Sequence, residues 1–113
     1  MSIFERDQYS VDCSAGSDRA VLRGVMRLAS PSAYDAAFAP IRARIASGAP
    51  PTIDLTDVTF MNSSGIRALA SLVLFAKEKD ATLRMVASNG IPWQKKTMSS
   101  FRAISPALTI ELR

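Results

Sequence analysis

Polar and apolar residues alternate in two segments of the first part of the chain, residues 8–13 and 19–28. This period of two predicts a pair of strands, each with one face turned to a core. Residues 14–18 between them have the composition of a turn, so we expect an antiparallel hairpin. Gly24, inside the second strand, indicates a bulge, a close approach of another backbone or simply a small residue. The apolar positions of the hairpin are Tyr9, Val11, Cys13, Leu22, Met26 and Leu28.

An apolar stripe at helical spacing follows at residues 30–48. Ser30 is in the position of an N-cap, Pro31 takes the first helical position, and Gly48 ends the helix. Pro40 lies inside the pattern and lacks a backbone N–H, so we expect it to kink the helix or to divide it. The apolar residues of the stripe are Tyr34, Ala37, Phe38, Ile41 and Ile45.

Two more helices, over residues 63–80 and 92–104, alternate with short strands at residues 52–56, 82–87 and 108–112. The order β-β-α-β-α-β-α-β predicts an α/β layer fold. Its mixed sheet should contain four to five strands with an N-terminal hairpin, and it should carry about three helices. The first of these short strands should be central and parallel to its neighbour.

The start of the second helix carries the clearest chemical signal in the chain, Asn62-Ser63-Ser64-Gly65. We expect a loop to lead from the preceding strand to Asn62, which suits an N-cap. Ser63 and Ser64 then lie in the first turn, where backbone N–H groups lack helical partners and the helix dipole is positive. A hydroxyl there lies at a site suited to phosphate, although the motif alone is also ordinary for a well-capped helix.

The outer face of the same helix is polar, with Arg67, Ser71 and Glu78, and Leu74 projects among them. An apolar residue in that setting offers a contact to a partner protein, although a single exposed leucine is also ordinary surface. In the third helix, Trp93 shares the spacing of the apolar residues, which favours a core position over a partner contact.

Composition favours an ordinary globular protein, because 48% of the residues are hydrophobic and 7% are aromatic. The length fits a single domain over residues 1–113. No apolar run is long enough to cross a bilayer, and the first seven residues carry charges of both signs instead of a signal-peptide core. We therefore expect a cytoplasmic protein, and the single cysteine, Cys13, agrees with a reducing compartment.

The absence of histidine excludes Ser-His-Asp and Cys-His catalysis, and one cysteine is too few for a structural zinc site. Neither a phosphate-binding P-loop nor a dinucleotide glycine motif is present. We expect no enzymatic activity, no metal and no cofactor. The net charge of +4 permits attraction to acidic partners. Because the basic residues are dispersed, with only Lys95-Lys96 beside an aromatic residue, we expect no direct contact with nucleic acid.

The order of elements and the segment from Ile53 to Ile66 resemble the STAS domain, and more specifically the bacterial anti-sigma factor antagonists. In that family a strand and a Phe-Met or Phe-Leu pair precede Asp-Ser-Ser-Gly or Asp-Ser-Thr-Gly at the start of a helix. The matching residues here are Phe60-Met61-Asn62-Ser63-Ser64-Gly65. The order of elements agrees over nearly the whole chain, whereas the sharp sequence match covers about residues 53–75. The resemblance implies a single-domain STAS-like fold.

The resemblance also implies regulation of transcription by partner switching. In the family an anti-sigma factor, which is a serine kinase, phosphorylates the first serine of the motif, and a phosphatase removes the phosphate. The unphosphorylated form binds the kinase and frees its sigma factor. Ser63 matches the acceptor, with Ser64 as the less favoured neighbour, and ATP belongs to the partner. Asn62 stands where the family usually has aspartate, which keeps the cap but removes a negative charge beside the acceptor.

The expected partner-binding surface combines the motif with the outer face of its helix. Its residues are Asn62, Ser63, Ser64, Gly65, Arg67, Ser71 and Leu74. An alternative keeps the same fold without the phosphorylation cycle. In that case the protein is a subunit of a membrane transport complex or a scaffold for stress signalling, and its partner belongs to that complex.

Overall fold

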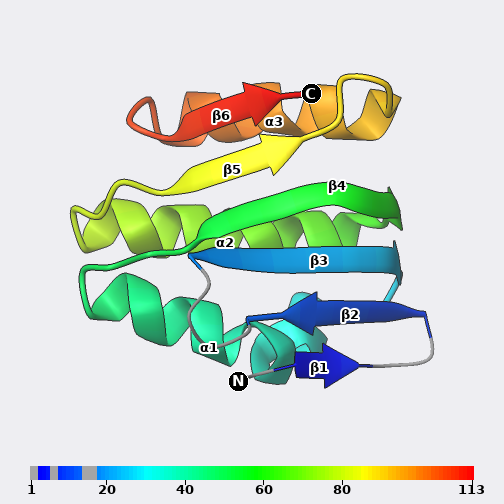
Figure 1. The fold of residues 1–113 in the computed structure, drawn as a ribbon, viewed down its shortest axis with the longest axis horizontal. Coiled ribbons are helices and arrows are strands. Elements are labelled where there is room, and N and C mark those ends of the chain that lie inside the picture. Colours follow the sequence, from blue (N-terminus) through cyan, green and yellow to red (C-terminus); the bar gives the residue numbers. More distant parts are fainter. Residues whose placement is uncertain (1–2, 6–7, 14–17) are drawn as a thin grey trace.

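The strands form one mixed sheet, and their order across the sheet is their order along the chain (Figure 1). The computed structural model describes residues 3–5, 8–13 and 18–113. The strands are β1 (Ile3–Glu5), β2 (Tyr9–Asp12), β3 (Arg19–Met26), β4 (Thr52–Met61), β5 (Arg84–Ala87) and β6 (Thr109–Leu112). β2 is antiparallel to both β1 and β3, whereas β3, β4, β5 and β6 are parallel.

These pairings confirm the predicted α/β class, the N-terminal hairpin and the central, parallel position of β4. Within the described residues the sheet has six strands, because β1 adds an edge strand that alternation did not predict. Of the turn expected over residues 14–18, only Asp18 lies within the described residues.

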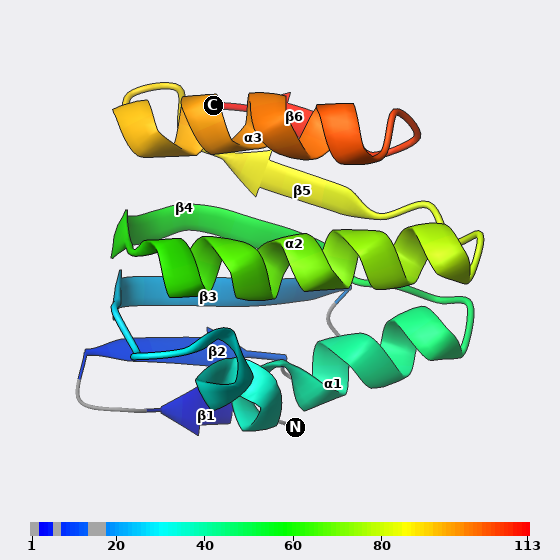
Figure 2. The same ribbon diagram turned by 180° about the vertical axis from the view of Figure 1, so that it is seen from behind.

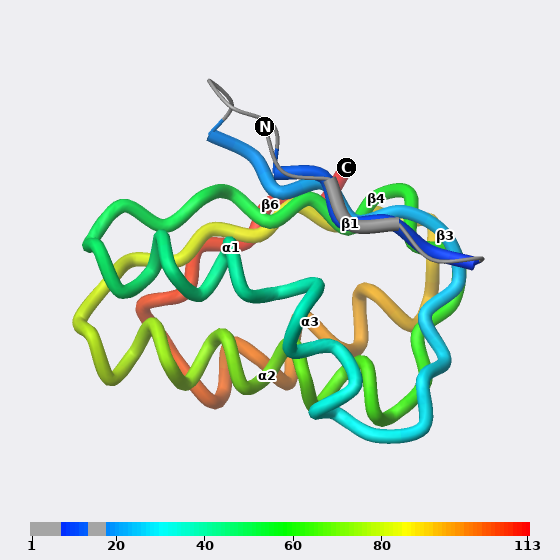
Figure 3. The backbone as a smooth tube through the Cα atoms, turned by 90° about the horizontal axis from the view of Figure 1, so that it is seen from below, coloured from blue at the N-terminus to red at the C-terminus, as the bar shows by residue number. Residues whose placement is uncertain are grey.

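Three α-helices cover one face of the sheet (Figures 2 and 3). They are α1 (Asp35–Ala46), α2 (Ser63–Glu78) and α3 (Pro92–Ile104), and a short 3-10 helix, η1 (Pro31–Tyr34), precedes α1. Each α-helix connects two adjacent parallel strands by a right-handed crossover (Figure 1). Since the strand order never reverses, right-handed crossovers place all three helices on the same face. No helix in the described part of the chain has the length and apolar character that a membrane span requires.

The segment predicted as one helix, kinked or divided at Pro40, is divided elsewhere. The division falls between η1 and α1, and α1 continues through Pro40. Pro40 is the sixth of the twelve residues of α1, and its missing N–H removes one hydrogen bond without ending the helix. Tyr34 at the junction is completely buried, and its hydroxyl accepts a hydrogen bond of 2.9 Å from the backbone N–H of Leu28. Tertiary packing therefore decides where this helix begins.

The ends of the same segment are partly as predicted. The Ser30 side chain makes no cap hydrogen bond, and its hydroxyl instead lies 3.2 Å from that of Ser32. Gly48 follows the end of α1 with a φ of +85°, and its N–H donates to the carbonyl of Ile45. A glycine after the last turn in the left-handed region is the common way to end a helix.

Gly24 in β3 is required by a close approach. Its φ is +99°, and an added Cβ atom would lie 2.1 Å from the carbonyl oxygen of Gln8. The next residue, Val25, donates its N–H to that same carbonyl at 2.7 Å. The pairing of β3 with β4 also shifts in register beside Gly24. The close approach predicted at this position is confirmed, whereas the extra residue at this register shift lies in β4 and not in β3.

The hydrophobic core lies between the sheet and the helices, and the opposite face of the sheet carries paired charges. The Arg19 guanidinium lies 2.9 Å from the Asp54 carboxylate, and the Arg84 guanidinium lies 3.2 Å from the Glu111 carboxylate. Burial opposes ionisation of Asp54, but hydrogen bonds from Thr56 and the Arg19 guanidinium outweigh it and lower the pKa of this carboxyl. These pairs give the open face of the sheet a polar surface.

Candidate functional site

The motif Asn62-Ser63-Ser64-Gly65 lies where β4 meets α2, at the edge of the sheet where the parallel strands end (Figure 1). The loop expected before Asn62 is absent, because β4 continues to Met61 and only Asn62 separates it from α2. The additional residues of β4 pair with β3, and the last pair is Met61 with Met26. The N–H of Asn62 then donates to the carbonyl of Met26 at 2.9 Å. The site is therefore held on a strand end instead of a loop.

The last part of β4 extends beyond the pairing with β5, which stops at Asp54. There the N-terminus of α3 takes the place of a strand. The side-chain NH₂ group of Gln94 donates to the carbonyls of Leu55 and Val58, each at 2.7 Å, and the Gln94 side-chain oxygen accepts from the N–H of Ser88 at 2.7 Å. Gln94 is completely buried. These bonds satisfy the backbone groups of β4 that no strand reaches.

Trp93 supports the same stretch of β4. Its ring is half-buried against the core, as the spacing predicted, and its indole N–H donates to the carbonyl of Thr59 at 3.2 Å. Gln94 was not identified from the sequence. The available signal was its helical spacing of four and seven residues to Met98 and Phe101, which makes it a polar residue within an apolar stripe.

Asn62 uses both ends of its side-chain amide. The oxygen accepts from the N–H of Gly65 at 3.0 Å, which confirms the predicted N-cap. The NH₂ group donates to the carbonyl of Leu28 at 3.0 Å and so connects the start of α2 to the segment after β3. Aspartate would keep the first bond, but its ionised carboxylate has no hydrogen to donate to Leu28. The bond to Leu28 therefore gives a structural reason for asparagine instead of aspartate at position 62.

Asn62→Asp should consequently lower the free energy of unfolding by about 1 kcal/mol, because the Leu28 carbonyl loses its donor and faces a negative charge. Attraction between the new carboxylate and the helix dipole offsets part of this loss. Urea denaturation at pH 7 measures the change. Asn89→Asp, at an exposed asparagine, introduces the same charge as a control. Equal stability of the two variants would show that the Leu28 bond contributes nothing.

The two serines of the motif lie in different surroundings. Ser63 is exposed, and its hydroxyl has no hydrogen-bond partner among the described residues. Ser64 is half-buried, and its hydroxyl donates to the carbonyl of Ala29 at 3.2 Å. Only the Ser63 hydroxyl is thus free to react without breaking a bond within the domain.

Gly65 is buried, and the space around it explains why this position is glycine. An added Cβ atom would lie 2.6 Å from the Cγ atom of Met61 and 3.4 Å from the hydroxyl of Tyr34. Gly65 therefore allows α2 to pack closely on the end of β4. This packing fixes the direction in which the first turn of α2 leaves the strand, and with it the position of Ser63.

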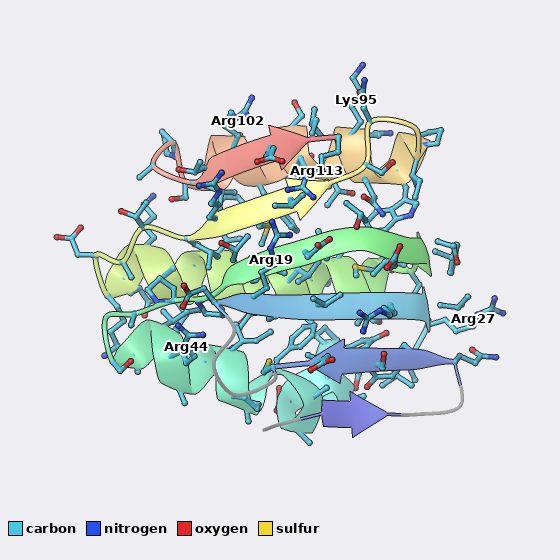
Figure 4. All side chains as sticks on the ribbon, viewed as in Figure 1. Arg19, Arg27, Arg44, Lys95, Arg102 and Arg113 are labelled. Atoms are coloured by element: carbon cyan, nitrogen blue, oxygen red, sulfur yellow. The ribbon has the colours of Figure 1, made fainter. Side chains whose placement is uncertain are left out.

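Two arginines lie toward the end of the sheet where α2 begins. The first turn of α2 contains no acidic residue, and the exposed Arg67 lies one turn further along the same helix. Arg27, just after β3, is at the same end of the sheet (Figure 4), and its guanidinium lies 5.4 Å from the centre of the Phe60 ring. Phe60 is 46% exposed. An anion on Ser63 would meet the backbone N–H groups of the first turn, which contains no acidic residue.

Phe60 and Arg27 were not identified as site residues, because the sequence placed Phe60 in a loop. Simple alternation along a longer strand would have put Phe60 on the same face as the buried Val58. In the structure, Val58 pairs with Gly24 and Phe60 with Val25, so that Thr59 is an extra residue in β4. This bulge reverses the alternation, and Met61 is buried in place of Phe60.

The remaining predicted residues lie along the outer face of α2. Arg67 is exposed, and Leu74 is 45% exposed, as predicted. Ser71 is half-buried, and its hydroxyl accepts from the Arg42 guanidinium at 3.0 Å. With Ser63 they follow one another at spacings of four, four and three residues, which places them on one side of the helix. Ser71 therefore joins this face to α1.

No group of three or more Cys, Asp and Glu side chains within the described residues is placed to bind a metal ion. The pKa of the Cys13 thiol is raised by burial and by the neighbouring Asp12, so the thiolate is disfavoured. Neither finding adds a catalytic group to the end of the sheet where Ser63 lies.

Comparison with known families gives one result. The family model of the STAS domain matches residues 33–111, from η1 to β6, a range that contains the whole of the site at the start of α2. A comparison with curated proteins finds no match. Since the matched segment is most of the chain, and the order and packing of its elements agree with the fold expected from the resemblance, the chain belongs to the STAS domain family.

Proposed function

We propose that this STAS-domain protein is a regulator of the anti-sigma factor antagonist type. It binds an anti-sigma factor that is also a serine kinase, and phosphorylation of Ser63 releases it until a phosphatase removes the phosphate. The observation that carries the proposal is the contrast between the two serines. Ser63 is exposed with a free hydroxyl, whereas Ser64 is bonded to Ala29. In this proposal the domain acts as a binding module and a substrate, without cofactor or catalysis of its own.

The surroundings of Ser63 support tolerance of a phosphate by the domain itself. A phosphate adds about −1.5 to −2 charges. The backbone N–H groups of the first turn favour that charge, and Arg67 lies one turn away. Asn62 caps the helix without a charge, so a phosphate on its neighbour meets no carboxylate from the cap. The modified domain should therefore keep its fold.

A partner that covers this surface would not tolerate the phosphate, because both bulk and charge enter a closed interface. The outer face of α2 offers such a partner the helix start at Ser63, the cation of Arg67 and the exposed side chain of Leu74. Phe60 adds an exposed aromatic ring at the adjoining end of β4. A loss of about 3 kcal/mol of binding free energy corresponds to more than a hundredfold in affinity. This difference is sufficient for a switch.

The test begins with capture of partners from the cell that makes this protein, followed by incubation of the captured kinase with ATP. We expect phosphate on the wild-type protein and on Ser64→Ala, but not on Ser63→Ala. Phosphorylated wild type and Ser63→Glu should bind the kinase at least a hundredfold more weakly than wild type by titration calorimetry. Tight binding by the phosphorylated protein, or phosphate on Ser64, contradicts the proposal. Stable association with transporter subunits without phosphate would instead favour the alternative role.

A further inference from the structure

The edge of the sheet formed by β6 has unpaired backbone groups. β6 is the last strand in the order and, among the described residues, pairs only with β5. The N–H groups of Thr109 and Arg113 donate toward β5, to Leu83 and Ala87. Successive residues of a strand point their backbone groups to opposite sides, so the N–H and C=O groups of Ile110 and Leu112 point away from the sheet. Such an edge can pair with another extended chain.

A hollow of about 160 Å³ lies beside this edge, between β6 and α3. Its lining residues are Lys95, Met98, Ser99, Arg102, Ile110 and Leu112. Met98 and the two β6 residues make its floor apolar. Leu112 is 42% exposed, although most leucine side chains of this chain are buried.

Two cations stand at the rim of the hollow. Lys95 and Arg102 project outward from α3 along the β6 side of the molecule (Figure 4). Neither has an acidic partner within the described part of the chain. The carboxylate of Glu111, the acidic residue of β6, forms ion pairs with Arg84 and Arg113 on the opposite face of the sheet. The hollow therefore combines an apolar floor with two uncompensated positive charges.

We propose that the β6 edge binds an extended acidic segment of a partner protein as an additional strand. Lys95 and Arg102 are seven residues apart in α3, which corresponds to about 10 Å along the helix. In an added strand, alternate side chains face α3, and positions four residues apart are about 13 Å from each other. A segment with the pattern acid-x-apolar-x-acid thus places its apolar residue in the hollow and its two acids within reach of the two cations.

The same charges disfavour a second copy of this chain at the edge. Two β6 strands paired around a twofold axis would bring the Lys95 and Arg102 side chains of both copies to one side of the joined sheet. These cations would repel one another, and among the described residues no acidic group of α3 or β6 on that side offsets the repulsion. The inference is independent of Ser63, which lies on α2.

Binding of synthetic peptides to the whole protein tests the inference. The probe is acetyl-Thr-Glu-Thr-Leu-Thr-Glu-Thr-amide, and its controls replace both glutamates by lysine or the two inner threonines by proline. We expect the acidic probe to bind at least tenfold more tightly than either control. In hydrogen-exchange NMR it should slow exchange at the amides of Ile110 and Leu112. The double variant Lys95→Glu/Arg102→Glu should reverse the preference between the acidic and the lysine peptide.

Three results of the peptide experiment would overturn the inference. They are equal affinity for the acidic and lysine peptides, protection of amides elsewhere than β6, and no binding of the acidic probe at millimolar concentration. Formation of a dimer through β6 in the absence of peptide would also overturn it. Both substitutions of the double variant lie at exposed positions of α3, and circular dichroism verifies that this variant remains folded.

Discussion

Gln94→Leu should lower the free energy of unfolding by about 3–5 kcal/mol. Leucine has a similar volume, so the main loss is the hydrogen bonds to Leu55, Val58 and Ser88. A buried backbone group left without a partner costs about 1–3 kcal/mol, and this substitution leaves three such groups. Urea denaturation measures the loss. Gln8→Leu, at an exposed position, serves as the matched control and should change stability by less than about 0.5 kcal/mol.

Gln94→Glu provides a second measurement at the same position. An ionised carboxylate at this point would face the carbonyl oxygens of Leu55 and Val58, whereas the protonated acid retains one donor. The folded-state pKa of this glutamate should therefore lie above its unfolded value of about 4.3. The variant should be nearest to wild type at acidic pH and lose stability as the pH rises through the folded-state pKa. A pH-independent deficit would contradict this account.

Gln94→Leu also tests whether α3 holds the end of β4 at the candidate site. Because Gln94 and Trp93 hold the last part of β4, the amides of residues 59–62 should exchange faster in Gln94→Leu than in wild type. A loss of stability below about 1 kcal/mol, with unchanged exchange at these amides, would show that β4 keeps its position without α3.

Gly24→Ala should lower the free energy of unfolding by about 3 kcal/mol or more. The new Cβ atom would lie 2.1 Å from the Gln8 carbonyl oxygen, which is a backbone atom and cannot move aside without disturbing β2. The φ of +99° adds backbone strain for a residue with a side chain. Relief of the contact would also weaken the 2.7 Å hydrogen bond from Val25 to Gln8. Chemical denaturation measures the total loss.

Two other glycines separate the cost of backbone strain from the cost of the contact with Gln8. Gly48 has a φ of +85° with no atom within 4 Å of an added Cβ, so Gly48→Ala measures backbone strain alone, about 1–2 kcal/mol. At Gly90 the nearest atom would be the Ser88 hydroxyl at 3.7 Å, and Gly90→Ala should be close to neutral. If Gly24→Ala costs no more than Gly48→Ala, the contact with Gln8 is unimportant.

The amino-acid sequence by itself determined the features that depend on neighbouring residues. Alternation predicted the hairpin, and helical spacing predicted α2 and α3, the latter with its observed bounds of Pro92 and Ile104. The short polar side chain of Asn62 predicted the cap of α2. Each of these signals acts within a few residues, which is why it can be recognised without the fold. The resemblance to the STAS domain, carried by residues 53–75, was confirmed by the family match.

Only the tertiary structure decided the features that depend on residues far apart in the chain. The bulge that turns Phe60 outward follows from the register of β4 against β3, some 35 residues earlier. The second bond of Asn62 reaches Leu28, and Gln94 bonds to strand residues 36 and 39 positions before it. No local pattern encodes such pairings, because they exist only after β3, β4 and α3 have packed together. The motif at Ser63 could therefore be located from the sequence, whereas its support by Leu28 and Gln94 and the exposure of Phe60 could not.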